Sequence, residues 1–144
     1  MASAMKFAQA RLSPPALAQV VAARAARLPA AYFDAVKDEY RRRRDVVYES
    51  LSSIEGVLVH RPEGAFYQMA RLPVTDSEDF VRFMLDEFDY NGTTTMVAPG
   101  GGFYAEEGMG MDEVRIAYVL NADDLRKSMD ALKAGLIAYR SKRA

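Results

Sequence analysis

Hydrophobic residues in the first third of the chain recur at helical spacings. Between residues 30 and 54 they lie three, four or seven positions apart, which predicts one long helix over residues 30–51 with a single apolar stripe. The residues of this stripe are Phe33, Val36, Tyr40, Val47, Leu51 and Ile54. Two shorter helices are expected before it, over residues 3–10 and from Ser13 to about Arg27, the second capped by the Ser13 hydroxyl and ended by Pro29.

After Gly56 the helical spacing gives way to an alternation of apolar and polar residues. Short strands are predicted over residues 57–59, 65–70, 94–97 and 113–119. The capping-box spacing of Thr75 and Glu78 predicts the start of a helix, and Asn121 caps a last helix with an apolar residue every three or four positions. These elements predict an α/β fold of the two-layer α+β kind, with helices packed on a small, mostly antiparallel sheet.

The composition is that of an ordinary globular domain. With 50% hydrophobic and 27% charged residues, the 144 residues are enough for one core, and a single domain over residues 1–144 is expected. A formal net charge of -1 predicts no attraction to nucleic acid or to an anionic membrane. The chain has no cysteine and a single histidine, His60, so neither a disulfide nor a metal site is expected. We find no signal peptide and no apolar run of membrane-spanning length, and we expect a cytoplasmic location.

Consecutive arginines, Arg41 to Arg44, lie in the predicted long helix and raise the question of phosphate binding. Acidic residues four positions away predict ion pairs on the helix surface instead. The expected pairs are Asp38 with Arg42, Glu39 with Arg43 and Arg41 with Asp45. No basic surface with aromatic residues accompanies the run, so we interpret it as a paired, solvated helix face and not as a nucleic-acid site.

The last third of the chain contains a glycine-rich loop that leads into an apolar strand with one arginine in it, Arg115. Side chains alternate across a strand, so Arg115 points away from the face that Val114 and Ile116 share. If it is partly enclosed, its planar guanidinium suits a planar anion such as a carboxylate, whereas an open position would make it an ordinary solvated arginine. The strand pattern alone leaves both interpretations open.

The loop residues Gly100, Gly101 and Gly102 also have two interpretations. Backbone amides of a glycine turn can cradle phosphate, but a dinucleotide-binding loop leads into a helix, and here a strand follows. A tight connection beside a cleft therefore fits the order of the elements better.

Four segments, in order along the chain, resemble the fold-type I, pyridoxal-phosphate-dependent aminotransferases of the aspartate aminotransferase family. They are residues 6–15, 40–48 and 61–67, followed by the C-terminal pattern Pro99, Gly100, Phe103, Gly108, Gly110, Arg115 and Ile116. Each segment alone is a weak motif, but together they cover nearly the whole chain. The resemblance implies the small, C-terminal domain of such an enzyme, in which residues 1–28 form a helical segment that faces the large domain.

The resemblance also implies roles for individual residues. Arg115 would bind the α-carboxylate of an amino-acid or 2-oxo-acid substrate, and Phe103 and Tyr104 would line the substrate cleft. Arg11 lies near the position that grips a distal carboxylate in the dicarboxylate-specific branch, but it is displaced by three residues, so the identity of the amino acid stays open. A homodimer is expected, because residues 6–15 and the following helix face the partner subunit in that family.

The catalytic groups of that family belong to its large domain. These are the lysine that forms a Schiff base with pyridoxal phosphate, the acid at the pyridine nitrogen and the phosphate site. We therefore assign no catalytic, cofactor-binding or metal-binding residue in this chain, and expect a fragment that has neither cofactor nor activity, cut from a parent enzyme that uses pyridoxal phosphate. The alternative is a free-standing regulatory or interaction module that reuses the domain.

Overall fold

The computed structural model describes residues 2–10 and 13–143. Contacts divide the chain into two compact units, with the boundary between Val36 and Lys37, and each unit is described by itself. The single domain expected over residues 1–144 therefore stays a prediction.

The first unit contains α1 (Ala2–Ala10), α2 (Ala16–Ala25) and the beginning of α3 (Ala30–Ser52). The cap expected at Ser13 is wrong, because the chain is still extended at Pro15, which is the cap residue and has no side-chain cap bond. The Gln19 side chain instead donates to the Pro14 carbonyl at 2.8 Å. No residue of α2 is buried, so this unit leaves its apolar side chains exposed.

α3 matches the predicted long helix, but its apolar stripe is buried only in the second unit. Val47 and Leu51 are fully buried, whereas Phe33 and Val36 are exposed. The stripe is therefore split at the boundary between the units, and only its second part belongs to a core.

Carboxylates pair with the whole arginine run of α3, although only one of the expected pairs, Arg43 with Glu39, is observed. Asp45 is paired with Arg61, from the following segment, which donates to it at 2.8 Å and 3.2 Å. The hydrogen bond from Arg44, with a smaller contribution from Arg61, lowers the pKa of Asp45. The pairs in α3 are Arg41 with Asp38, Arg42 and Arg43 with Glu39, and Arg44 with Asp45.

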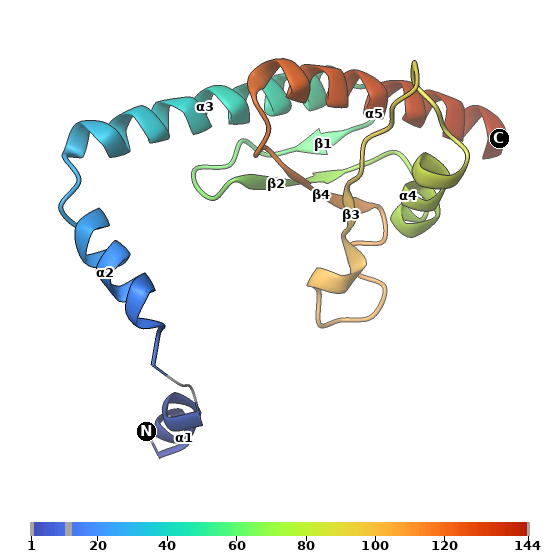
Figure 1. The fold of residues 1–144 in the computed structure, drawn as a ribbon. Coiled ribbons are helices and arrows are strands. Elements are labelled where there is room, and N and C mark those ends of the chain that lie inside the picture. Colours follow the sequence, from blue (N-terminus) through green and yellow to red (C-terminus); the bar gives the residue numbers. More distant parts are fainter. Residues whose placement is uncertain (1, 11–12, 144) are drawn as a thin grey trace. The chain divides into compact units, whose positions relative to one another are not determined.

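The second unit is built on a sheet of four strands, which confirms the predicted fold class. The order is β1 (Leu58–Val59), β2 (Tyr67–Arg71), β4 (Glu113–Ala117) and β3 (Ala98–Pro99), and all neighbours are antiparallel. In Figure 1 the strands run below α5 (Ala122–Arg143) and the second part of α3, with α4 (Ser77–Asp86) at one end. Residues of all three helices and of the sheet form one core.

The strand predicted over residues 94–97 is wrong. β3 is only the pair Ala98–Pro99, and the preceding stretch is held elsewhere. Tyr90 and Thr93 form a bridge of their own, and the Thr94 hydroxyl donates to the Met84 carbonyl at 2.7 Å, which ties this stretch to α4 and not to β4.

The two later helices begin with carboxylate or amide caps. Asn121 caps α5 as predicted, since its side-chain oxygen accepts from the backbone amides of Asp123 and Asp124. α4 is capped by Asp76 and not by Thr75, because the Asp76 carboxylate reaches the amides of Glu78 and Asp79. Among the described residues, no helix is long and apolar enough to cross a membrane.

Gln68 of β2 is the anomaly of the core face. It is only 3% exposed, it lies opposite Ile116 in the sheet, and neither its amide nitrogen nor its oxygen has a hydrogen-bond partner among the described residues. A buried polar group without a partner costs free energy that an apolar side chain at the same place would not.

Replacing Gln68 by leucine removes both unpaired groups at nearly constant size. We expect Gln68→Leu to raise the free energy of unfolding by about 1–2 kcal/mol, because an unsatisfied buried group costs about 1–3 kcal/mol. Urea denaturation followed by far-UV circular dichroism measures the change, with Gln68→Asn, which keeps the amide, as the control. A loss of stability in Gln68→Leu would show that the amide has a partner in solution.

Candidate functional site

Arg115 lies in the middle of β4, on the face of the sheet that the helices leave open. Its neighbours Val114 and Ile116 are buried in the core, and Arg115 itself is half-buried. It is paired across the sheet with Met69 of β2 and Ala98 of β3. Both neighbouring strands therefore hold the backbone of Arg115, so the position of its Cα is fixed by the sheet.

Two aromatic rings contact the Arg115 guanidinium. Its Cζ lies 4.6 Å from the ring centroid of Phe103 and 5.2 Å from that of Tyr67. These are cation–π distances, and such contacts restrain a guanidinium without giving its N–H groups an acceptor.

No carboxylate or carbonyl among the described residues accepts a hydrogen bond or ion pair from Arg115. Most other arginines of the second unit do have such a partner, for example Arg43 with Glu39 and Arg126 with Asp123, each at 2.7 Å. A half-buried guanidinium with its donors unmatched is suited to a planar anion, since its fork of N–H groups matches the two oxygens of a carboxylate.

The other candidate residues lie in different places. Phe103 ends the short 3-10 helix η1 (Gly101–Phe103) and contacts Arg115, whereas the Tyr104 hydroxyl turns to Glu113 and donates to its carboxylate at 2.5 Å. This bond, helped by partial burial, raises the pKa of Tyr104, because ionisation would lose the donor and set two negative charges together. Arg11 lies outside the described residues. The proposed site roles of all four residues stay predictions.

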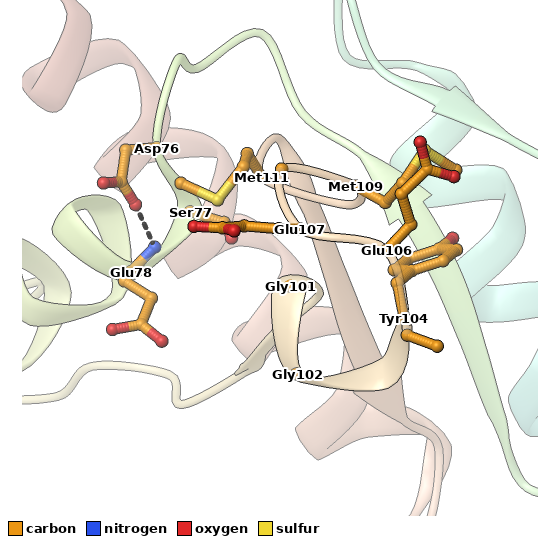
Figure 2. A pocket seen from close by; sticks show the side chains of 12 residues that line it. Asp76, Ser77, Glu78, Gly101, Gly102, Tyr104, Glu106, Glu107, Met109 and Met111 are labelled. Atoms are coloured by element: carbon orange, nitrogen blue, oxygen red, sulfur yellow. Dashed lines mark hydrogen bonds between the residues drawn. The ribbon is translucent and has the colours of Figure 1, made fainter.

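A pocket of about 450 Å³ lies between the glycine loop and the start of α4. Figure 2 shows Asp76 and Glu78 on one side of it and Tyr104 and Met109 of the loop on the other. Glu106 and Glu107 add to this acidic lining, and neither Arg115 nor Phe103 contributes to it. An acidic wall repels a carboxylate, so the pocket does not suit an anionic substrate, and the open sheet face at Arg115 does.

The described residues do not fit pyridoxal phosphate, the cofactor that the resemblance implies. Each lysine is exposed to solvent, and none is among the residues that line the pocket beside the glycine loop. These lysines are Lys6, Lys37, Lys127, Lys133 and Lys142. Within the described part of the chain, no group of three or more histidine, cysteine, aspartate or glutamate side chains is placed to hold a metal ion.

Two contacts of the site were not predicted. Tyr67 lies in the strand predicted over residues 65–70, but its contact with Arg115 was not predicted; it is 40% exposed. Glu113 was not singled out, although the two-residue spacing that places it on the same face of β4 as Arg115 was readable in the sequence. Its bond to Tyr104 depends on how the loop folds back, which the spacing does not specify.

In sequence the chain is similar to known aminotransferases. It is 34% identical over 113 residues to an aspartate aminotransferase of Sulfurisphaera tokodaii, covering 70% of this chain and 26% of that protein. It is 33% identical over 103 residues to an LL-diaminopimelate aminotransferase of Oleidesulfovibrio alaskensis, covering 71% of this chain and 24% of that protein. The chain thus spans about a quarter of the length of these relatives.

Solved structures agree with the sequence relatives. The alanine aminotransferase of Pyrococcus furiosus superposes with a TM-score of 0.75 at 25% identity, covering 92% of this chain and 33% of that one. The family model for aminotransferase class I and II matches residues 1–132, and this match includes the loop and the strand that carry Phe103 and Arg115. The chain therefore belongs to the class I and II aminotransferases.

Proposed function

We propose that this chain supplies the carboxylate-binding part of an aminotransferase that transfers an amino group between an amino acid and a 2-oxo acid. The observation that carries the proposal is Arg115, a half-buried cation in contact with two aromatic rings and without an acidic partner among the described residues. We place the activity in the cytoplasm, as the sequence predicts.

The proposed ligand is the α-carboxylate, and the substrate side chain is left open. The relatives named above act on aspartate, LL-diaminopimelate and alanine by their names, and these amino acids share only the α-carboxylate and the α-amino group. A guanidinium that binds both oxygens of the carboxylate fixes the direction of the Cα substituents, which is a positioning role. The contacts with Phe103 and Tyr67 restrain that guanidinium before the substrate arrives.

Replacing Arg115 by lysine tests this role in an aminotransferase that contains this chain. Lysine keeps the charge but loses the two-pronged contact, so we expect a loss of about 2–5 kcal/mol in transition-state stabilisation, measured as kcat/KM for an amino acid. Arg126→Lys, on the exposed surface of α5, is the matched control. Activity toward an amine without a carboxylate should fall far less, and an equal loss toward both substrates would make Arg115 a folding residue.

We further propose that the groups that hold pyridoxal phosphate lie outside these residues. All lysines of the chain are exposed, whereas a lysine that forms a Schiff base with a cofactor is activated by a desolvated site or by a neighbouring cationic group.

The isolated chain is therefore expected neither to bind pyridoxal phosphate specifically nor to transaminate. Equilibrium dialysis of the 144-residue chain against the cofactor should show only weak, non-saturable uptake by surface lysines. Saturable binding of one cofactor per chain would overturn the proposal that the groups that hold pyridoxal phosphate lie outside these residues.

A homodimer is the proposed assembly, and the first unit supports it. Phe7, Leu17, Val20 and Val21 are between 60% and 80% exposed in that unit. Apolar side chains that cluster on exposed helices are seldom left uncovered by a soluble monomer. A second copy of the chain could cover them.

Sedimentation of the chain at low micromolar concentration tests this assembly. We expect the mass to rise with concentration toward that of a dimer, and Leu17→Glu to lower the association because it places a charge in the apolar surface. Ile137→Glu, which changes a similarly exposed apolar residue on α5, is the control and should leave the association unchanged. A monomer at every concentration would contradict the proposal.

A further inference from the structure

The glycine loop between β3 and β4 is tied to β4 at both of its ends. The amide of Gly100 donates to the Glu113 carbonyl at 2.7 Å, and the amide of Glu113 donates to the Gly110 carbonyl at 3.1 Å. Residues 101–109 therefore form a loop that is closed by two backbone hydrogen bonds, both of them with Glu113.

Two glycines allow this closure. A Cβ on Gly100 would lie 2.7 Å from both the Glu113 Cβ and the Gly110 carbonyl oxygen. Gly110 has a φ of +69°, and a Cβ there would lie 2.4 Å from the ring of Tyr104. The ring of Tyr104 thus lies directly on the backbone of Gly110, where only glycine leaves room for it.

The hydroxyl of Tyr104 completes the closure. It donates to the Glu113 carboxylate at 2.5 Å, a bond to a charged acceptor and thus of the stronger kind. This side-chain bond connects the middle of the loop to the strand residue that precedes Arg115 by two positions and shares its face.

Phe103 is the residue next to Tyr104 and is itself 49% exposed, so little besides its position in the loop keeps it in place. The amide of Phe103 donates to the Gly100 carbonyl at 3.0 Å, and its ring contacts the Arg115 guanidinium. A loop that left β4 would take this ring with it, whereas the contact with Tyr67 comes from β2 and would remain.

We infer that Tyr104 and Glu113 are a positioning pair, which holds Phe103 on Arg115 and thereby sets the affinity of the site for the substrate carboxylate. The inference rests on the proposed function of Arg115. In this inference Tyr104 and Glu113 act through Phe103, and the cleft-lining role predicted for Tyr104 is not required.

Nuclear magnetic resonance of the 144-residue chain tests the contact itself. The ring of Phe103 should shift the side-chain proton resonances of Arg115 upfield, and Phe103→Leu identifies the part of the shift that this ring causes. We expect Tyr104→Phe and Glu113→Ala to remove at least about half of that part, and Glu113→Gln, which still offers an acceptor, to keep most of it. Glu107→Ala removes a loop carboxylate without a bond to Tyr104 and is the matched control.

The double variant Tyr104→Phe with Glu113→Ala separates a pair from a general loosening of the loop. If the two residues act through one bond, the double variant should change the shift no more than either single variant. Additive changes, or an unchanged shift in both single variants, would overturn the inference.

Kinetics in an aminotransferase that contains this chain test the consequence. We expect Tyr104→Phe to raise KM for an amino acid about 3- to 10-fold, the range for the loss of one hydrogen bond, with kcat and the activity toward a carboxylate-free amine nearly unchanged. If Arg115→Lys discriminates between the two substrates and Tyr104→Phe does not change KM, the inference fails and the proposed function stands. If Arg115→Lys does not discriminate, the proposed function fails, and with it the role given to the pair.

Discussion

The alternation of side chains along β4 is the constraint on which the second unit depends. Val114 and Ile116 must enter the core, and the same pleat places Glu113 and Arg115 on the open face. Since β4 is bonded to β2 on one side and to β3 on the other, its register cannot shift without moving apolar residues out of the core. The packing of the core therefore fixes the origin of the only half-buried arginine that contacts two rings among the described residues.

The candidate anion site lies on the open face of the sheet. It consists of the Arg115 guanidinium and two rings, one contributed by a neighbouring strand and the other by a loop that folds back. The pocket between the glycine loop and the start of α4 is acidic. The concave surface of this unit and its unmatched cation therefore lie in different places. A carboxylate is attracted by unmatched donors and repelled by other carboxylates, so it suits the face at Arg115 better than the acidic pocket.

Periodicity predicted the elements that bury a continuous stripe. The last helix, its cap at Asn121 and the alternation around Arg115 could be read from the sequence, because each follows from local spacing. The strand over residues 94–97 and the cap at Thr75 were wrong. The Thr94 hydroxyl bonds to α4 instead, and the Asp76 carboxylate accepts the hydrogen bonds of the helix cap. The contact of Tyr104 with Glu113 could not be predicted, since it depends on the path of a loop whose glycines allow many conformations.

The two outer strands of the sheet are each only two residues long, and one of them ends in Pro99. A proline has no backbone donor, so the outer side of β3 offers little to a further strand. An open, partly apolar sheet face is usually a risk, because sheets that expose apolar residues can also grow at their edges. Short edges remove that route to aggregation, so the open face of the sheet can stay uncovered without recruiting unrelated strands.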